Sequence, residues 1–169
     1  MTREGALAIM IAVAVVLLAA LAWAWWRRTR RDATPLVVAG ELPADAHVRA
    51  TFDALYVATT ARDAPLERIA APGMAFRSKA TVTVADEGVA VGLTGQDPFV
   101  LTPDRIVDVG QSTVAIDRVV ETGGLTRLTW RTDAGSTVDT YFRPQDASAR
   151  ALADAVAGIL PPTQTGTDS

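Results

Sequence analysis

The chain has 169 residues, a net charge of −3 and 49% hydrophobic residues, a length that suits one globular domain beside a separate apolar segment. It contains no cysteine and a single histidine, His47. This excludes disulfide bonds, zinc–thiolate sites, a thiol nucleophile and any metal cluster built from several histidines. The mean hydropathy of +0.20 is high for a chain with 21% charged residues, because apolar residues are concentrated near the N-terminus.

Residues 5–26 contain no charged side chain and predict a transmembrane helix. At about 1.5 Å per residue such a helix is roughly 33 Å long, enough to cross a hydrocarbon core of about 30 Å. The charges of Arg3 and Glu4 cancel within the short segment 1–4, whereas four arginines follow the apolar run. The positive-inside rule therefore predicts a single-pass protein of the cell membrane, with residues 1–4 outside and the C-terminal domain in the cytoplasm. The residues expected at the cytoplasmic membrane interface are Trp23, Trp25, Trp26, Arg27, Arg28, Arg30 and Arg31.

A cleaved signal peptide is the alternative interpretation of this segment. Ala20, Leu21 and Ala22 have the small-x-small form of a cleavage site. However, a signal peptide is basic before its apolar stretch, whereas here the positive cluster follows it, and the apolar run is longer than is usual for such peptides. The flanking charges and the length favour a retained anchor.

Residues 27–49 predict a basic juxtamembrane segment and a tether. Pro35, Gly40 and Pro43 interrupt any sustained periodicity, which leaves room for at most one short strand at 36–38. Beyond the arginine cluster, residues 32–169 carry 18 acidic and 11 basic side chains, a net charge of −7. A domain this acidic is not expected to bind nucleic acid.

From residue 81 onward the pattern of apolar residues has a period of two, which indicates half-buried β-strands. Upstream, residues 50–59 are enriched in Phe52, Leu55, Tyr56 and Val57 and are expected to form the opening strand. Asp86, Glu87 and Gly88 have the form of a tight hairpin connection, and Gly110 is expected to mark a bulge or bend. Strands are expected at residues 50–59, 81–84, 89–93, 99–101, 106–113, 125–132 and 138–143.

The period changes after residue 144. Leu152, Val156, Ile159 and Leu160 have the spacing of one face of an amphipathic helix. Seven antiparallel strands are too many for one flat sheet in a domain of this size. We therefore expect a mainly β domain at residues 50–160, an antiparallel barrel or sandwich with the helix covering an open end, followed by a disordered tail at 161–169.

Strands in a meander followed by one C-terminal helix resemble the pleckstrin-homology (PH)-like barrel. Three short strings carry a closer resemblance: YVATT at 56–60, PGMAFR at 72–77 and LTW at 128–130. With the N-terminal apolar helix, they resemble a family of actinobacterial single-pass membrane proteins that have a bacterial PH-like domain. The resemblance covers nearly the whole chain and implies a PH-like module. It implies no biochemical activity, since none is established for that family.

The sequence contains no recognisable catalytic or metal-binding arrangement. There is no phosphate-binding loop, and His47 falls in the predicted tether without fixed neighbours. Two carboxylate pairs, Asp86 with Glu87 and Asp104 with Asp108, are explained more simply by a turn and a strand break. A hydrolase that uses such carboxylates is the least favoured hypothesis, and no catalytic residue, metal or cofactor is expected.

Arg77 and Lys79 are the one pair of cations singled out as a candidate contact for phosphate or lipid. Alternate residues of a strand project to one face, and two cations together can hold a phosphate; the alternative is a solvated strand face. The favoured function is a non-catalytic protein-interaction or scaffolding module held at the inner leaflet by its helix, with the bilayer and a protein as partners. The alternative is a domain that binds an anionic lipid or a small ligand.

Overall fold

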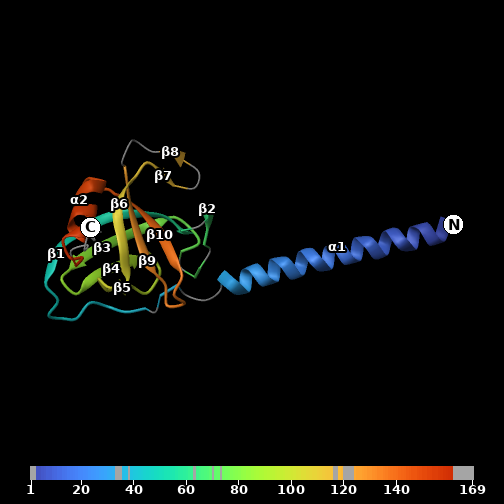
Figure 1. Ribbon diagram of the computed structural model, residues 1–169, viewed down its shortest axis with the longest axis horizontal. Coiled ribbons are helices and arrows are strands. Elements are labelled where there is room, and N and C mark those ends of the chain that lie inside the picture. Colours follow the sequence, from blue (N-terminus) through green and yellow to red (C-terminus); the bar gives the residue numbers. More distant parts are fainter. Residues whose placement is uncertain are drawn as a thin grey trace, which may run out of the picture. The chain divides into compact units, whose positions relative to one another are not determined.

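The computed structural model describes residues 3–32, 36–37, 39–62, 64–69, 71–72, 74–115, 118–119 and 124–161. Contacts divide the chain into two compact units, Met1–Thr34 and Pro35–Ser169. The first unit consists of one helix and the second is mainly β (Figure 1). Each unit is therefore described by itself.

Helix α1 (Arg3–Asp32) contains the apolar segment. Among the described residues it is the one helix long and apolar enough to cross a membrane, with a mean hydropathy of 2.4 over Ile9–Arg27; a signal sequence has the same properties. Trp23, Trp25 and Trp26 are exposed, and Cζ of Arg27 lies 5.6 Å from the centroid of the Trp23 ring, a cation–π arrangement. The other three interface arginines, Arg28, Arg30 and Arg31, belong to α1, but their side chains lie outside the described residues.

The second unit is built on one antiparallel sheet, and all seven strands expected from the sequence are present. The strands, in sheet order, are β5 (Phe99–Leu101), β4 (Gly88–Leu93), β3 (Ser78–Ala85), β1 (Val48–Ala61), β10 (Thr137–Pro144), β9 (Leu125–Arg131) and β6 (Ile106–Ser112). Three further short strands were not expected: β2 (Ala64–Arg68), which pairs with β1, and β7 (Val114–Ala115), which pairs with β8 (Arg118–Val119).

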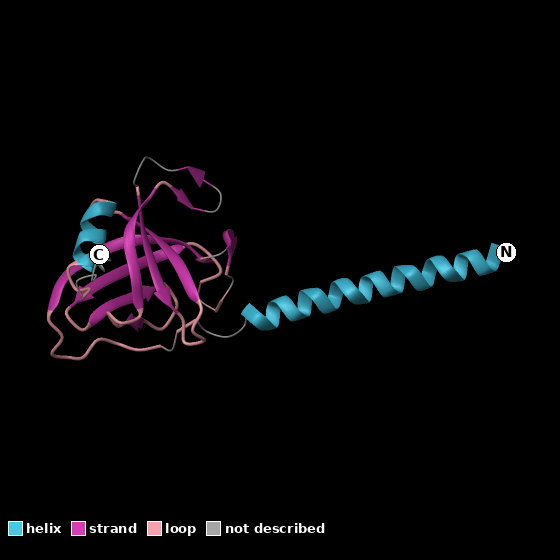
Figure 2. Ribbon diagram, viewed as in Figure 1, coloured by secondary structure: helices cyan, strands magenta, loops and turns pink. Residues whose placement is uncertain are grey.

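The long strand β1 joins the two halves of the sheet. Residues 48–56 of β1 pair with β3, and residues 54–61 pair with β10, with a register shift between Tyr56 and Ala58. A register shift of this kind bends a strand and increases its twist. The sheet therefore curls upon itself (Figure 2). Strands β5 and β6 are the two ends of its strand order.

Helix α2 (Ala149–Ala157) packs against β6, β9, β10 and β1. Its N-cap is Ser148, whose Oγ accepts a hydrogen bond from the backbone N–H of Ala151 at 3.1 Å. Leu152 and Val156 are buried against the sheet, whereas Ile159 and Leu160 follow the helix and pack on the core from its C-terminal side. The prediction of a mainly β domain, a barrel or sandwich of about seven antiparallel strands with one C-terminal helix, is confirmed in its strands and its helix.

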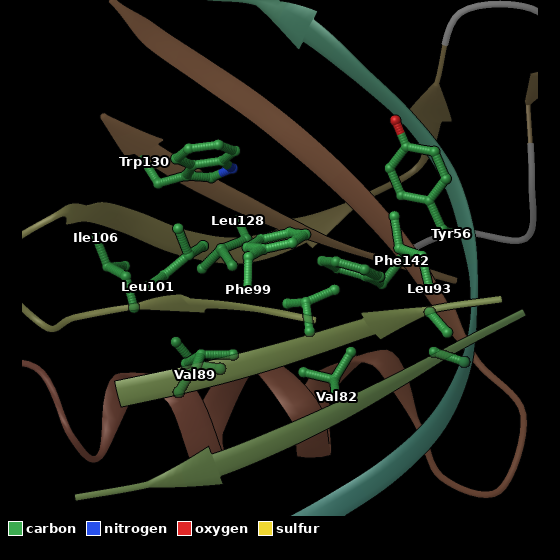
Figure 3. Close-up of a cluster of buried hydrophobic side chains, with 14 of the residues drawn as sticks. Tyr56, Val82, Val89, Leu93, Phe99, Leu101, Ile106, Leu128, Trp130 and Phe142 are labelled. Carbon is green, nitrogen blue, oxygen red and sulfur yellow. The ribbon is translucent and has the colours of Figure 1, made fainter. Parts of the chain in front are cut away.

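The core lies inside the curled sheet (Figure 3). Trp130 is fully buried, and the centroid of its ring lies 6.2 Å from the centroid of the Phe99 ring. Tyr56 and Phe142 meet edge to face, with centroids 6.2 Å apart. The other large side chains exposed by less than 2% are Leu101, Leu125, Leu128, Leu152, Val82, Val84, Val89, Val91 and Val138.

The segment before residue 50 was predicted to be a tether, but part of it is attached to the globular unit. Val37 is 8% exposed and belongs to the hydrophobic core. The carbonyl of Leu36 accepts a hydrogen bond from Asp133 N at 3.0 Å, and Gly40 N donates to the carbonyl of Pro98 at 2.9 Å. Residues 36–37 form a bend and not a strand. The globular unit therefore includes residues well before the predicted boundary at residue 50.

Smaller differences from the predictions concern the irregularity of strand β6 and the ends of helix α1. Gly110 pairs regularly with Arg127, and the irregularity of β6 lies instead between Ile106 and Asp108. Helix α1 extends beyond the predicted span of 5–26 at both ends. Residues 162–169, which make up nearly all of the predicted tail, lie outside the described residues.

Candidate functional site

A groove of about 680 Å³ lies on the outer face of β1, β3 and β4. Alternation along the strands creates this face, because Phe52, Ala54 and Tyr56 point into the core and their neighbours point outward. The register places Asp53 opposite Thr81 and Leu55 opposite Lys79. The outward-facing lining residues are Asp53, Leu55, Lys79, Thr81, Gly92, Thr94 and Gln145.

Hydrogen bonds fix the backbone around this groove. Gln145 N donates to the carbonyl of Asp53 at 2.8 Å, which holds the end of β10 beside β1. Thr94 donates to the carbonyl of Lys79 from both N and Oγ1, at 3.1 and 3.2 Å. A Cβ built on Gly92 would meet nothing closer than the carbonyl oxygen of Thr81 at 4.0 Å. A side chain at Gly92 would therefore have room, and the backbone there does not require glycine.

The described lining of the groove contains one cation and one carboxylate. Lys79 and Asp53 both line it, with hydroxyl and amide groups from Thr81, Thr94 and Gln145. Arg77 is exposed immediately before β3 and is not among the described lining residues. A phosphate placed in the groove would meet Lys79 but would also be repelled by Asp53. A ligand with both donors and acceptors suits this surface better.

The loop before β3 carries an exposed aromatic ring that the sequence patterns did not single out. Phe76 is 81% exposed, whereas Met74, two residues earlier, is 4% exposed. The carbonyl of Met74 accepts a hydrogen bond from the Tyr56 hydroxyl at 2.8 Å. Arg68 donates to the carbonyl of Ala75 at 3.0 Å. The available signal was the apolar Met74–Phe76 stretch beside Arg77, but only the tertiary contacts show which of its side chains points outward.

The carboxylates considered as acid–base or metal pairs are largely engaged in ion pairs. Asp86 pairs with Arg49, and Asp108 Oδ2 lies 2.7 Å from an Nη atom of Arg127. Glu87 accepts a hydrogen bond from the backbone N–H of His47 at 3.2 Å. Within the part of the chain that the structure describes, no three His, Asp or Glu side chains are grouped so as to hold a metal ion.

His47 has fixed neighbours, contrary to the expectation from sequence. Its carbonyl accepts a hydrogen bond from Asp86 N at 3.1 Å, so the backbone is attached to the β3–β4 hairpin. The side chain is nevertheless 84% exposed, and its Nδ1 lies 4.0 Å from the carboxylate of Asp86. The arrangement holds the start of β1 beside the hairpin, and the described side chain near the imidazole is the carboxylate of Asp86.

Strand β6 forms one end of the sheet and pairs with β9 alone among the described strands. Ile106 is buried, whereas Val107 is 40% exposed at the register shift between Ile106 and Asp108. The opposite end of the strand order, β5, has only three residues. An edge strand offers backbone donors and acceptors to an incoming chain. Of the two edge strands, β6 is the longer and therefore offers more of these groups.

The open, helix-capped barrel is the architecture expected of a PH-like domain. The family model described as "Bacterial PH domain-like" matches residues 35–157. The chain therefore belongs to the bacterial PH domain-like family, and the matched range includes Val37, in agreement with the early start of the globular unit.

Two solved structures are similar to this chain at low sequence identity. One is the crystal structure of the C-terminal domain of an unknown protein from Leishmania infantum, with 12% identity, 69% of this chain and 85% of that chain covered, and a TM-score of 0.44. The other is the solution structure of the C-terminal phosphotyrosine interaction domain of APBB2 from mouse, with 15% identity, coverage of 75% and 96%, and a TM-score of 0.49. No curated protein matches the chain.

Proposed function

We propose that this protein is a membrane-anchored, non-catalytic module that binds a partner protein at the inner leaflet, and that the partner adds an extended segment to the edge of β6. The observation that carries the proposal is the position of β6, seven residues long, at the end of the sheet order. Strand addition uses main-chain hydrogen bonds for affinity and alternate side chains for specificity. Membership of a PH-like family supports an interaction role.

Site-specific crosslinking followed by hydrogen exchange tests this surface. A photoreactive amino acid replaces Val107 on β6 or, as a matched control, Thr51, an exposed position on the central strand β1. We expect a specific adduct in membranes from position 107 and none from position 51. With the identified partner purified, amide exchange in residues 106–110 slows at least tenfold. Equal adducts from both positions, or protection confined to β3 and β4, contradict the proposal.

Labelling of single cysteines tests the proposed anchorage, because the natural chain contains no cysteine. We propose that α1 stays in the mature protein, with its N-terminus outside and the PH-like domain in the cytoplasm. A membrane-impermeant maleimide then labels Thr2→Cys in intact cells. It labels Arg150→Cys, an exposed site on α2, only after permeabilisation. Loss of an N-terminal epitope tag from the mature protein indicates a cleaved leader instead.

The alternative function is the binding of an anionic lipid headgroup or a small ligand, and the groove that Lys79 and Asp53 line favours a small ligand with both donors and acceptors. Gly92→Leu is a sharp test, because a side chain there fills the groove without an immediate clash. Under the alternative, ligand binding is lost in Gly92→Leu and kept in Gly95→Ala, which lies outside the groove lining. Partner binding at β6 that survives Gly92→Leu favours the first proposal.

A further inference from the structure

The groove on β1, β3 and β4 holds two opposite charges that do not neutralise each other. Asp53 and Lys79 both line it, and both are exposed. In the part of the chain that the structure describes, neither side chain forms an ion pair, whereas other aspartates there pair with arginines. Each charge is therefore available to a group of opposite charge on a ligand.

Strand register sets the spacing of these two charges. Asp53 lies opposite Thr81, and Lys79 lies opposite Leu55, so Asp53 and Lys79 are diagonal neighbours on the outer face. Diagonal neighbours of an antiparallel pair lie about 7–8 Å apart. A small molecule that enters between them can therefore contact both charged groups at once.

The Asp53 side of the groove offers acceptors. Gln145 N donates to the carbonyl of Asp53 at 2.8 Å, which brings Gln145 beside it. Nε2 of Gln145 donates to the carbonyls of Arg143 and Pro144 at 3.0 and 3.3 Å, so its Oε1 remains as the acceptor. An ammonium group carries three donors and no acceptor. The Asp53 carboxylate and the Gln145 amide oxygen together suit such a group.

The Lys79 side of the groove suits a carboxylate. The hydroxyl of Thr81 makes no hydrogen bond to a described residue and can donate beside the Lys79 ammonium. Thr81 lies opposite Gly92 on β4, where even a Cβ would meet nothing closer than 4.0 Å. Leu55, half-buried opposite Lys79, adds apolar surface for the rest of a ligand.

Charge balance selects the class of ligand. An anion is attracted by Lys79 but repelled by Asp53 and by the net charge of −7 on residues 32–169. A cation meets the opposite conflict at Lys79. A molecule that carries one ammonium and one carboxylate satisfies both side chains and has no net charge. The volume of about 680 Å³ is within the range of small-molecule sites.

We propose that this groove binds a small zwitterion with a free ammonium and a free carboxylate group, an α-amino acid or a dipeptide. The ammonium contacts Asp53 and Gln145, and the carboxylate contacts Lys79 and Thr81. This inference rests on the alternative function, in which the groove takes a small ligand, and names the chemistry of that ligand. It leaves the edge of β6 available to a protein partner.

Isothermal titration calorimetry of the full chain in detergent micelles is the test. The probes are the common α-amino acids and, as the dipeptide, glycyl-leucine. The tightest binder is then compared with its N-acetylated form and its C-terminal amide, each of which keeps only one charge. We expect at least one probe to bind and each blocked form to bind at least tenfold more weakly, because Asp53 or Lys79 then lacks its counter-charge.

Matched charge variants locate the site. Asp53→Asn and Lys79→Gln are each expected to weaken binding at least tenfold. The controls Asp97→Asn and Arg150→Gln change the net charge equally at exposed positions outside the groove lining, and we expect them to leave the Kd within about twofold, because solvent and salt screen distant charges. All four side chains are exposed, so the unfolding midpoints are expected to stay unchanged, which a denaturant titration verifies.

Three results overturn the proposal: no probe binds, the blocked forms bind as tightly as the free zwitterion, or glycerophosphoethanolamine binds more tightly than every probe. The last result would assign the groove to a lipid headgroup. The alternative function itself has a separate readout. A ligand that is lost in Gly92→Leu but kept in Asp53→Asn and Lys79→Gln shows that the groove is a binding site, whereas the zwitterion is wrong.

Discussion

The indole Nε1 of Trp130 donates a hydrogen bond to Oγ1 of Thr140 at 2.9 Å, between the neighbouring strands β9 and β10. Both side chains are buried, Trp130 at 0% and Thr140 at 1% exposure. Oγ1 of Thr140 lies 2.9 Å from that of Thr59, which lies 3.0 Å from the Tyr56 hydroxyl. The Tyr56 hydroxyl in turn lies 2.8 Å from the carbonyl oxygen of Met74.

One arrangement of protons satisfies this buried network. A carbonyl can only accept, and a hydroxyl has one proton, so Tyr56 donates to Met74 and accepts from Thr59. Thr59 then accepts from Thr140, and Thr140 accepts from Trp130. Each hydroxyl donates once and accepts once, so burial leaves none of these groups without a partner. The network ties β1, β9 and β10 to the loop that presents Phe76.

Thr140→Val is expected to destabilise the globular unit by about 1–3 kcal/mol. The substitution keeps the shape but leaves the buried indole N–H of Trp130 without an acceptor. The measurement is the free energy of unfolding in urea, on residues 35–169, which form a compact unit with a core of their own. The control is Thr83→Val on the outer face of β3, where a change below about 0.5 kcal/mol is expected. Equal effects at the two sites contradict the network.

Stability is expected to fall between about pH 10 and pH 12. Burial raises the pKa of Tyr56 from 10.0 to about 12, and burial and Asp139 also raise that of Tyr141. A folded-state pKa above the unfolded value means that the contribution to stability is fully present below pH 10. It is lost as the pH rises towards 12, because the unfolded state then releases its protons first.

Tyr56→Phe tests this pH dependence. At about 1.4 kcal/mol per pKa unit, the Tyr56 contribution to the loss reaches about 2 kcal/mol at pH 12. The variant is less stable than the wild type at pH 7, because Met74 loses its donor, but its unfolding free energy falls less steeply above pH 10. Urea titrations at pH 9 to 12 measure both effects. If the unfolding free energies of the wild type and Tyr56→Phe fall in parallel as the pH rises, the loss does not come from Tyr56.

Gly88→Ala is expected to be strongly destabilising. Gly88 begins β4 with φ 150°, and a Cβ there would lie 2.5 Å from the backbone carbonyl oxygen of Leu101. The clash is with backbone, which cannot rotate away, so we expect a loss of more than about 3 kcal/mol or failure to fold. Gly95→Ala is the matched control: its φ is also positive, at 78°, but nothing lies within 4 Å. Its expected cost is about 1 kcal/mol, and similar midpoints for both variants would show that the β4–β5 contact is not tight.

Val37→Asp tests whether the segment before residue 50 belongs to the domain. Val37 is 8% exposed in the core, so a carboxylate there is expected to cost more than about 2 kcal/mol. Ala39→Asp, two residues later and exposed, is expected to change the unfolding free energy by less than about 0.5 kcal/mol. Urea titrations of residues 35–169 carrying each substitution measure the two effects. If Val37→Asp has no effect, residues 36–37 are a tether, as the sequence suggested.

Most of the strands and the helix α2 could be predicted from sequence periodicity, because their formation depends on local rules. Alternating side chains at 81–84 and 89–93 need only one buried face to form strands, and Asp86–Glu87 provides the turn between them. The face of α2 at Leu152 and Val156 could likewise be inferred from helical spacing. Strand β2 was missed, and Gly110 was wrongly expected to mark the irregularity of β6, because bends depend on neighbouring strands.

The candidate site was much less predictable. Lys79 was singled out as half of a cation pair, but the groove combines it with Asp53 from β1 and Gln145 from the end of β10. Those residues are far apart in sequence and meet only through strand pairing. Similarly, Phe76 differs in no local way from Met74, yet one is exposed and the other buried. The difference comes from the hydrogen bonds of Tyr56 and Arg68.

By itself, the sequence determined an apolar helix with an asymmetric charge distribution, an acidic domain of antiparallel strands and the absence of thiol chemistry. These features follow from composition and from the periods of single strands and helices. Only the tertiary structure decided that Val37 belongs to the core, that the barrel stays open at β5 and β6, and which side chains share the Lys79 groove. The physical reason is that these features depend on strand register and on hydrogen bonds between distant segments, which one-dimensional periodicity does not encode.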